Sequence, residues 1–161
     1  MASTAAAKPA IRRVSGAEIG PYLEDLARLR ITVFRDFPYL YDGTLAYESA
    51  YVQTYADCAQ SVIVLALVDE RVVGASTGIP LEREGAAFRA PFTAHGYDPA
   101  RIFYGGESVL LPEYRGSGVY RQFFLQREGF ARELGRFDTF AFCAVWSWLQ
   151  ARVAGSESSS E

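Results

Sequence analysis

The sequence contains little of two residue types that build reactive centres, since it has two cysteines and one histidine among 161 residues. Cys58 and Cys143 are far apart and form no Cys-x-x-Cys pair, so both are expected to be reduced thiols in a cytoplasmic protein. His95 lies in a turn-like stretch, where a solvated loop residue is the favoured interpretation. A histidine-based zinc site is therefore disfavoured, no metal site is predicted, and a triad would have to use His95.

Long apolar runs and basic runs are also missing. No apolar segment approaches the roughly 20 residues of a membrane span, so no membrane partner is expected. The net charge is −3 without a sustained basic stretch, which argues against nucleic-acid binding. Residues 1–10 are rich in alanine but lack the continuous apolar core of a secretory signal, and we expect a flexible N-terminus there.

Half of the residues are apolar, which is enough for one globular domain with its own core. Apolar residues at helical spacing predict helices, and near-continuous apolar runs predict buried strands. The expected strands are 11–14, 61–68, 71–79, 101–111 and 138–145, and the expected helices are 21–37, 44–59 and 118–134. The stretch 80–99 is expected to be a long loop with a short helix. This order predicts an α/β domain with a mixed sheet flanked by helices.

The most informative segment runs from Val109 to Tyr120. An apolar run stops at Pro112, passes through Gly116-Ser117-Gly118 and enters a segment with helical periodicity. Glycines let the backbone approach a ligand closely, and the first turn of a helix has N–H groups without intrahelical partners. Together with the positive end of the helix dipole, these groups favour a phosphate or pyrophosphate. The segment predicts a cofactor that carries phosphate.

The residues from Pro112 to Gly118 resemble the acetyl-CoA loop of the GNAT N-acetyltransferase superfamily, whose signature is Gln/Arg-x-x-Gly-x-Gly/Ala. Arg115 and Gly118 fill the first and fourth places, and Tyr120 stands at the sixth, where Gly or Ala is usual. The order of elements over residues 11–145 also looks like the first five strands and three helices of that fold. The resemblance implies a GNAT-like acyltransferase domain over 11–145.

The resemblance implies acetyl-CoA as co-substrate and a role for the backbone around the loop. The N–H groups of the loop would hold the pyrophosphate, and those residues are Gly116, Ser117, Gly118, Val119 and Tyr120. Backbone groups of Leu110 and Leu111 would pair with the pantetheine arm, and the Leu110 N–H would stabilise the oxyanion. Arg115 would contact phosphate or remain an exposed cation beside Glu113.

Acyl transfer to an amine requires a neutral amine, and Glu107 stands on the strand where the family often places an acidic base. The alternative is a structural role at the end of a strand loosened by Gly105-Gly106. The acceptor wall is expected between the first two helices, where aromatic faces and carboxylates suit a cationic amine. The substrate-binding candidates are Phe37, Tyr39, Tyr41 and Asp42, whereas Tyr51 and Tyr55 fit a core stripe.

The end of the sequence departs from the family pattern, because residues 146–161 leave no room for a further helix and two strands. We expect a C-terminally shortened domain with a short, partly disordered tail, and a homodimer would cover the apolar edge at 138–145. Three functional interpretations follow. They are an acetyl-CoA-dependent N-acetyltransferase, a silent acyl-CoA-binding or interaction module, and an unrelated α/β protein whose glycine loop is only a turn.

Overall fold

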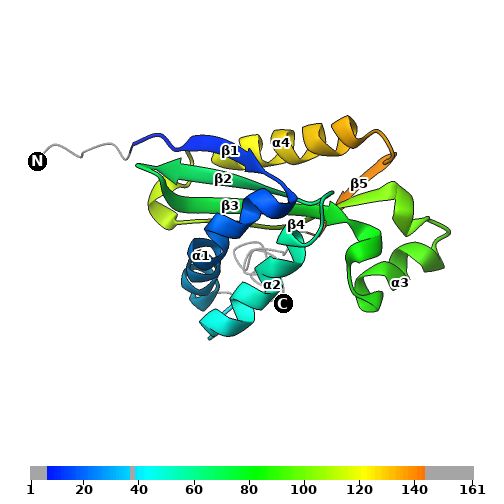
Figure 1. Ribbon diagram of the computed structural model, residues 1–161, viewed down its shortest axis with the longest axis horizontal. Coiled ribbons are helices and arrows are strands. Elements are labelled where there is room, and N and C mark those ends of the chain that lie inside the picture. The colour runs from blue at the N-terminus through cyan, green and yellow to red at the C-terminus, as the bar shows by residue number, and fades with distance from the viewer. Residues whose placement is uncertain (1–6, 37–38, 144–161) are drawn as a thin grey trace, which may run out of the picture.

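The computed structural model describes residues 7–36 and 39–143, and these form one five-stranded sheet with helices on both faces (Figure 1). The strands follow sequence order and are β1 (Ala10–Val14), β2 (Val62–Val68), β3 (Arg71–Pro80), β4 (Ile102–Leu110) and β5 (Thr139–Phe142). The pairs from β1 to β4 are antiparallel and β5 is parallel to β4. The predicted mixed α/β sheet is therefore confirmed.

The α-helices are α1 (Leu23–Arg35), α2 (Leu45–Ala56), α3 (Ala86–Ala94) and α4 (Val119–Leu134). Thr44 caps α2, since its hydroxyl accepts from the Tyr47 N–H at 3.3 Å. Pro21 falls in a 3-10 turn over Gly16–Tyr22, so α1 begins two residues later than predicted. The loop 80–99 contains α3 as its short helix. No helix in the described ranges is long and apolar enough to cross a membrane.

Both faces of the sheet are covered, which explains the uninterrupted apolar sequence of β2. Residues Val62 to Leu67 are all buried. A Cβ on Gly105 would meet Arg127 of α4, whereas one on the next residue, Gly106, would meet Tyr55 of α2. Neighbouring residues therefore point to helices on opposite faces, with α4 on one side and α1 and α2 on the other (Figure 1).

A β-bulge interrupts β4 at its middle. Ser76 pairs with Ser108 and Gly78 pairs with Gly105, so Thr77 alone opposes Gly106 and Glu107. A bulge places an extra residue in one strand and redirects its side chains. Glu107 consequently points to the same face as Gly106, toward α1 and α2, where it meets Arg30 and Tyr51.

The parallel pairing of β5 with β4 is short. It joins residues 102–105 of β4 to residues 139–142 of β5, so residues 106–110 of β4 have no neighbour from β5 within the described part of the chain. The predicted tail 146–161, the candidate Phe37 and residues 1–6 lie outside the described residues. β1 begins at Ala10, one residue before the predicted start. Within the described residues, the last part of β4, residues 106–110, therefore borders a space that β5 does not fill.

Candidate active site

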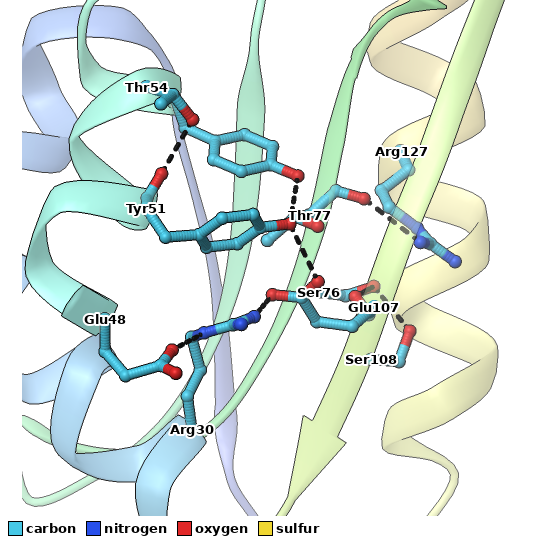
Figure 2. A network of polar contacts seen from close by, with 10 residues as sticks. Arg30, Glu48, Tyr51, Thr54, Ser76, Thr77, Glu107, Ser108 and Arg127 are labelled. Carbon is cyan, nitrogen blue, oxygen red and sulfur yellow. Dashed lines mark hydrogen bonds and ion pairs between the residues drawn. The ribbon is translucent and has the colours of Figure 1, made fainter. Parts of the chain in front are cut away.

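A pocket of ≈ 450 Å³ lies where the pairing of β4 with β5 ends. Its walls come from both faces of the sheet, since Tyr51 of α2 and Glu107 lie on one face while Ser108 and Arg127 of α4 lie on the other (Figure 2). The other lining residues are Phe34, Tyr39, Glu84, Phe88, Tyr104, Gly106, Tyr120, Phe124, Phe142 and Cys143. The pocket is therefore aromatic with a few charged groups, the usual character of a small-molecule site.

The glycine loop begins α4 with unpartnered backbone donors. Gly116 and Gly118 have φ of 76° and 83°, in the left-handed region that glycine adopts without strain, and a Cβ on either would meet no atom within 4 Å. Among the described residues, no backbone acceptor partners the N–H groups of residues 116–121; the first donor of α4 with one is Gln122, bonded to the Gly118 carbonyl at 3.3 Å. Exposed donors at a helix N-terminus suit an anionic group.

The Leu110 N–H, at the end of β4 next to this loop, points toward the site. The Leu111 N–H donates to the Val73 carbonyl at 2.9 Å, and the Leu111 carbonyl accepts from the Tyr114 N–H. Because amide directions alternate along an antiparallel strand, the Leu110 N–H points away from β3, to the side that β5 leaves open. The Leu111 N–H is already bonded within the sheet, so it is not available to the pantetheine arm as expected from the sequence.

The side chains of the glycine loop contact the protein itself. The sequence alone predicts that Arg115 contacts phosphate or remains exposed beside Glu113. Arg115 donates its Nε–H to the Leu110 carbonyl at 3.3 Å, which holds the guanidinium at the free edge of β4. Ser117 donates its hydroxyl to the Tyr114 carbonyl and tightens the loop. Tyr120 lines the pocket and packs edge-on against Phe123, so it forms part of the pocket wall. Val119 is buried in the core, which leaves only its backbone for binding.

Glu107 belongs to a buried ionic network (Figure 2). Arg30 of α1 forms ion pairs with both Glu107 and the fully buried Glu48 of α2. The guanidinium carbon of Arg30 also lies 4.2 Å from the centre of the Tyr51 ring, and the Tyr51 hydroxyl donates to Glu107 at 3.2 Å. One guanidinium is shared by two carboxylates, so these three side chains carry a net negative charge next to the pocket.

Burial shifts several titratable groups near this network. It raises the pKa of Tyr51 and raises the pKa of Tyr55 well above its ordinary value, which keeps both phenols protonated at neutral pH as donors. Burial also raises the pKa of Glu84, which lines the pocket and has no ion-pair partner among the described residues. Carboxyl groups with a raised pKa in a cleft are candidates for proton transfer.

The predicted acceptor residues divide into two groups. Tyr39 lines the pocket and packs edge-on against Phe34, as expected for an acceptor wall. Tyr41 lies instead beside Glu48, and the exposed Asp42 pairs with Arg35 at 3.3 Å, so neither lines the pocket. Tyr51, which the sequence assigned to the core, does line the pocket. Helical spacing cannot distinguish a residue facing the core from one facing a cavity within it.

Several lining residues were missed by the sequence analysis, among them Glu84, Phe124 and Arg127. Phe124 and Arg127 follow Tyr120 at four and seven residues, a spacing that places all three on one face of α4 and could have revealed them. Glu84 follows a short 3-10 turn in the segment expected to be a loop, and no local pattern indicates that it would reach the pocket. The described residues contain no cluster of three potential metal ligands.

Comparison with known proteins gives structural relatives only. No family model and no curated protein matches the sequence. The aminoglycoside N-acetyltransferase AAC(6')-Iy in complex with CoA matches with a TM-score of 0.62 at 15% identity, over 95% of this chain and 88% of that one. AAC(6')-IG from Acinetobacter haemolyticus matches with a TM-score of 0.59 at 18% identity, over 94% and 90% of the two chains.

A third match is the aminoglycoside acetyltransferase meta-AAC0020 from an uncultured soil metagenomic sample, in complex with sisomicin, with a TM-score of 0.58 at 15% identity. That match covers 95% of this chain and 90% of that chain. The chain has the GNAT fold. Structural matches at such low sequence identity establish the fold. The activity has to be argued from the site.

The site of this GNAT fold can be tested against acetyl-CoA, the donor that the glycine loop suggests. A diphosphate needs several convergent donors and room to approach them, and the loop offers unpartnered N–H groups with open space above Gly116 and Gly118. A pantetheine amide needs a strand edge to pair with, and residues 106–110 of β4 have no neighbour from β5 within the described part of the chain. The residues present therefore fit this co-substrate.

Proposed function

We propose that the chain is an acetyl-CoA-dependent N-acetyltransferase of GNAT type that acts on a primary amine of a small molecule or peptide. The observation that carries this proposal is the open row of backbone donors at residues 116–121, placed next to a pocket that contains a carboxylate. The GNAT fold of the chain and the relatives solved with CoA support it.

The proposed reaction needs few protein groups. The neutral amine attacks the thioester carbonyl carbon, a C–N bond forms and the C–S bond breaks. Glu107 receives the proton that the amine loses, directly or through water, and the Leu110 N–H donates to the developing oxyanion. The departing thiolate takes up a proton from water to give free CoA, and Glu107 releases the proton of the amine to water. Loop residues Gly116 to Tyr120 hold the diphosphate through their N–H groups.

The charge of the pocket supports a cationic amine as acceptor. The shared guanidinium of Arg30 leaves an excess negative charge on Glu48 and Glu107, and Glu84 adds a carboxylate on the same pocket. The aromatic side chains of Tyr39 and Tyr51 also line this pocket, and aromatic rings attract cations. The structural relatives include aminoglycoside acetyltransferases, whose substrates are polyamines of this chemical class.

A matched pair of glycine variants tests acetyl-CoA binding. Gly118 and Gly96 have φ of 83° and 81°, and a Cβ on either meets no atom within 4 Å, so valine imposes the same backbone strain at both sites. We expect Gly118→Val to abolish binding in isothermal titration calorimetry, because it displaces the donors, and Gly96→Val to retain it. Equal affinities in both variants, or no binding by the wild-type chain, would refute the proposal.

Turnover is tested by release of free CoA against a panel of amines. We expect Glu107→Gln to lower kcat by about 10²- to 10⁴-fold, the usual contribution of a general base. Glu113→Gln, a nearby exposed carboxylate, is the control and should leave kcat unchanged. Unaltered turnover in the Glu107 variant would assign the base to another group.

A silent acyl-CoA-binding or interaction module is the second candidate. Its supporting observation is the ion pair of Glu107 with Arg30, because the guanidinium occupies the carboxylate that would otherwise be free to contact an amine. Acetyl-CoA binding by the wild-type chain without CoA release against any amine would favour this candidate.

Two further expectations belong with the proposal. Cys58 and Cys143 are free thiols, which suits the cytoplasm as the proposed compartment.

Within the described residues β5 pairs only with β4, so its outer edge is open to a second copy of the chain. Sedimentation velocity would identify such a homodimer, and a monomer at micromolar concentration would contradict it.

A further inference from the structure

Arg127 stands out among the charged residues of the pocket because no carboxylate in the described part of the chain pairs with it. Its side chain is buried, with 1% of the residue exposed, yet it lines the pocket. A guanidinium has five N–H donors, and among the described residues one hydrogen bond engages it, from Nη1 to the Thr77 carbonyl at 3.1 Å. The Nε–H is buried without an acceptor in the described part of the chain.

The surroundings of the Arg127 guanidinium are apolar or neutral. Its central carbon lies 4.7 Å from the centre of the Phe124 ring and 5.7 Å from that of Phe140. No ion pair to Arg127 is found among residues 7–36 and 39–143, whereas the partly buried Arg30 holds two carboxylates. Burial lowers the pKa of Arg127 to about 10, so the group stays charged at neutral pH. A buried charge without a counter-ion is costly unless a ligand supplies one.

The position of Arg127 along α4 limits which anion it can meet. Tyr120, Phe124 and Arg127 share the pocket face of the helix. Arg127 follows Gly118 by nine residues, which corresponds to about 13 Å at the helical rise of 1.5 Å per residue. The diphosphate expected at the N-terminus of α4 is therefore too far away, and the anion must belong to the part of a substrate that lies inside the pocket.

We propose that Arg127 binds a carboxylate of a substrate, carried either by the acyl group of the CoA thioester or by the amine acceptor. This inference rests on the proposed acyl-CoA-dependent function and makes its substrate class more specific. A carboxylate matches the fork of a guanidinium with two parallel hydrogen bonds, and such charge-assisted bonds are stronger than those to neutral acceptors.

The acyl arm of the test compares succinyl-CoA with butyryl-CoA, which have the same chain length and differ in the terminal carboxylate. If the acyl group carries the anion, calorimetry with the wild-type chain should show succinyl-CoA binding about tenfold to a hundredfold more tightly. The acceptor arm compares the kcat/KM for an amino acid with that for its amide, using CoA release, and should show a similar ratio if the acceptor carries it.

Variants assign the preference to this side chain. The ratio that measures the preference for the substrate with a carboxylate should fall close to one in Arg127→Gln. In Arg127→Lys the ratio should be intermediate, because lysine keeps the charge and lacks the two parallel N–H donors of the guanidinium. Arg132→Gln, an exposed arginine of the same helix, is the matched control and should keep the wild-type ratio. If Arg127→Gln does not fold, the comparison of the wild type with Arg127→Lys still tests the role of Arg127, since an unchanged ratio in Arg127→Lys would contradict it.

The outcomes separate the two proposals. A chain that binds acetyl-CoA but prefers a carboxylate in neither arm would overturn the role of Arg127 while the acetyltransferase proposal stands. A carboxylate preference that survives in Arg127→Gln would overturn it as well. A chain that binds no CoA thioester would refute the proposed function and this inference together.

Discussion

The ionic network around Arg30 allows a quantitative prediction about stability. Its three members differ in exposure, with 12% of the Arg30 side chain, 0% of Glu48 and 20% of Glu107 accessible. Arg30→Met preserves much of the side-chain volume but removes the guanidinium. The fully buried Glu48 carboxylate then loses its ion-pair partner, and Glu107 loses one of its contacts.

The expected loss follows from the burial of Glu48. Removing one partner of a buried ion pair costs about 3–5 kcal/mol in the free energy of unfolding, because the remaining charge has no compensation. For a chain of this length that loss corresponds to a fall in Tm of roughly 6–20 °C. Replacing both partners with apolar side chains removes the uncompensated charge, so Arg30→Met combined with Glu48→Met should be more stable than Arg30→Met alone.

Urea denaturation followed by circular dichroism measures these differences. Arg28→Met is the matched control, since Arg28 lies on the same helix and its pair with Glu24 has side chains 63% and 68% exposed. We expect that control to cost at most about 0.5 kcal/mol. If Arg30→Met costs no more than Arg28→Met, or if the double variant is less stable than the single one, the reasoning about the buried network is wrong.

Two further predictions concern the pocket. Gly106→Ala should destabilise the chain by about 1–3 kcal/mol in urea denaturation, because its Cβ would collide with Thr77 Oγ1, while Gly129→Ala in α4, where a Cβ meets nothing within 4 Å, should stabilise it by up to ~1 kcal/mol. Equal effects of the two alanines would contradict the close approach at Gly106. Burial raises the pKa of Glu84 above 4.5, so its contribution to stability is lost as pH rises through that folded value. Glu84→Gln should therefore raise Tm at pH 7.5 and make no difference at about pH 3; a gain independent of pH would show that the carboxylate charge is not responsible.

Local patterns predicted the elements because they depend on nearby residues. The apolar run of β2, the Thr44 cap of α2 and the Asp69-Glu70 turn, with φ of 50° and 60°, all follow rules that act within a few positions. Element ends were less accurate, and α2 ends at Ala56 instead of near residue 59. The pattern that predicts the glycine loop also lies within a few consecutive residues, so the place of the loop at the start of α4 could be predicted.

The pocket itself could be predicted only in part. Glu107 was found because the strand and the loop are adjacent in sequence, but its ion pair with Arg30 depends on the packing of α1 against the sheet. Tyr41 and Asp42 were expected in the acceptor wall because they lie near Tyr39 in sequence. Over such short stretches the chain turns, and Tyr41 lies beside Glu48 instead. Proximity in sequence does not fix the direction of a side chain in a loop.

The amino-acid sequence alone determined the order of strands and helices and the open backbone of residues 116–118, because hydrophobic period, capping and glycine conformation are properties of short segments. Tertiary structure decided which charges meet. The bulge in β4 turned Glu107 toward Arg30, and the packing of α4 buried Arg127 beside the pocket without a carboxylate among the described residues. Both results arise from contacts between segments far apart in the chain, where burial and charge are set by the packed neighbours and no local pattern records them.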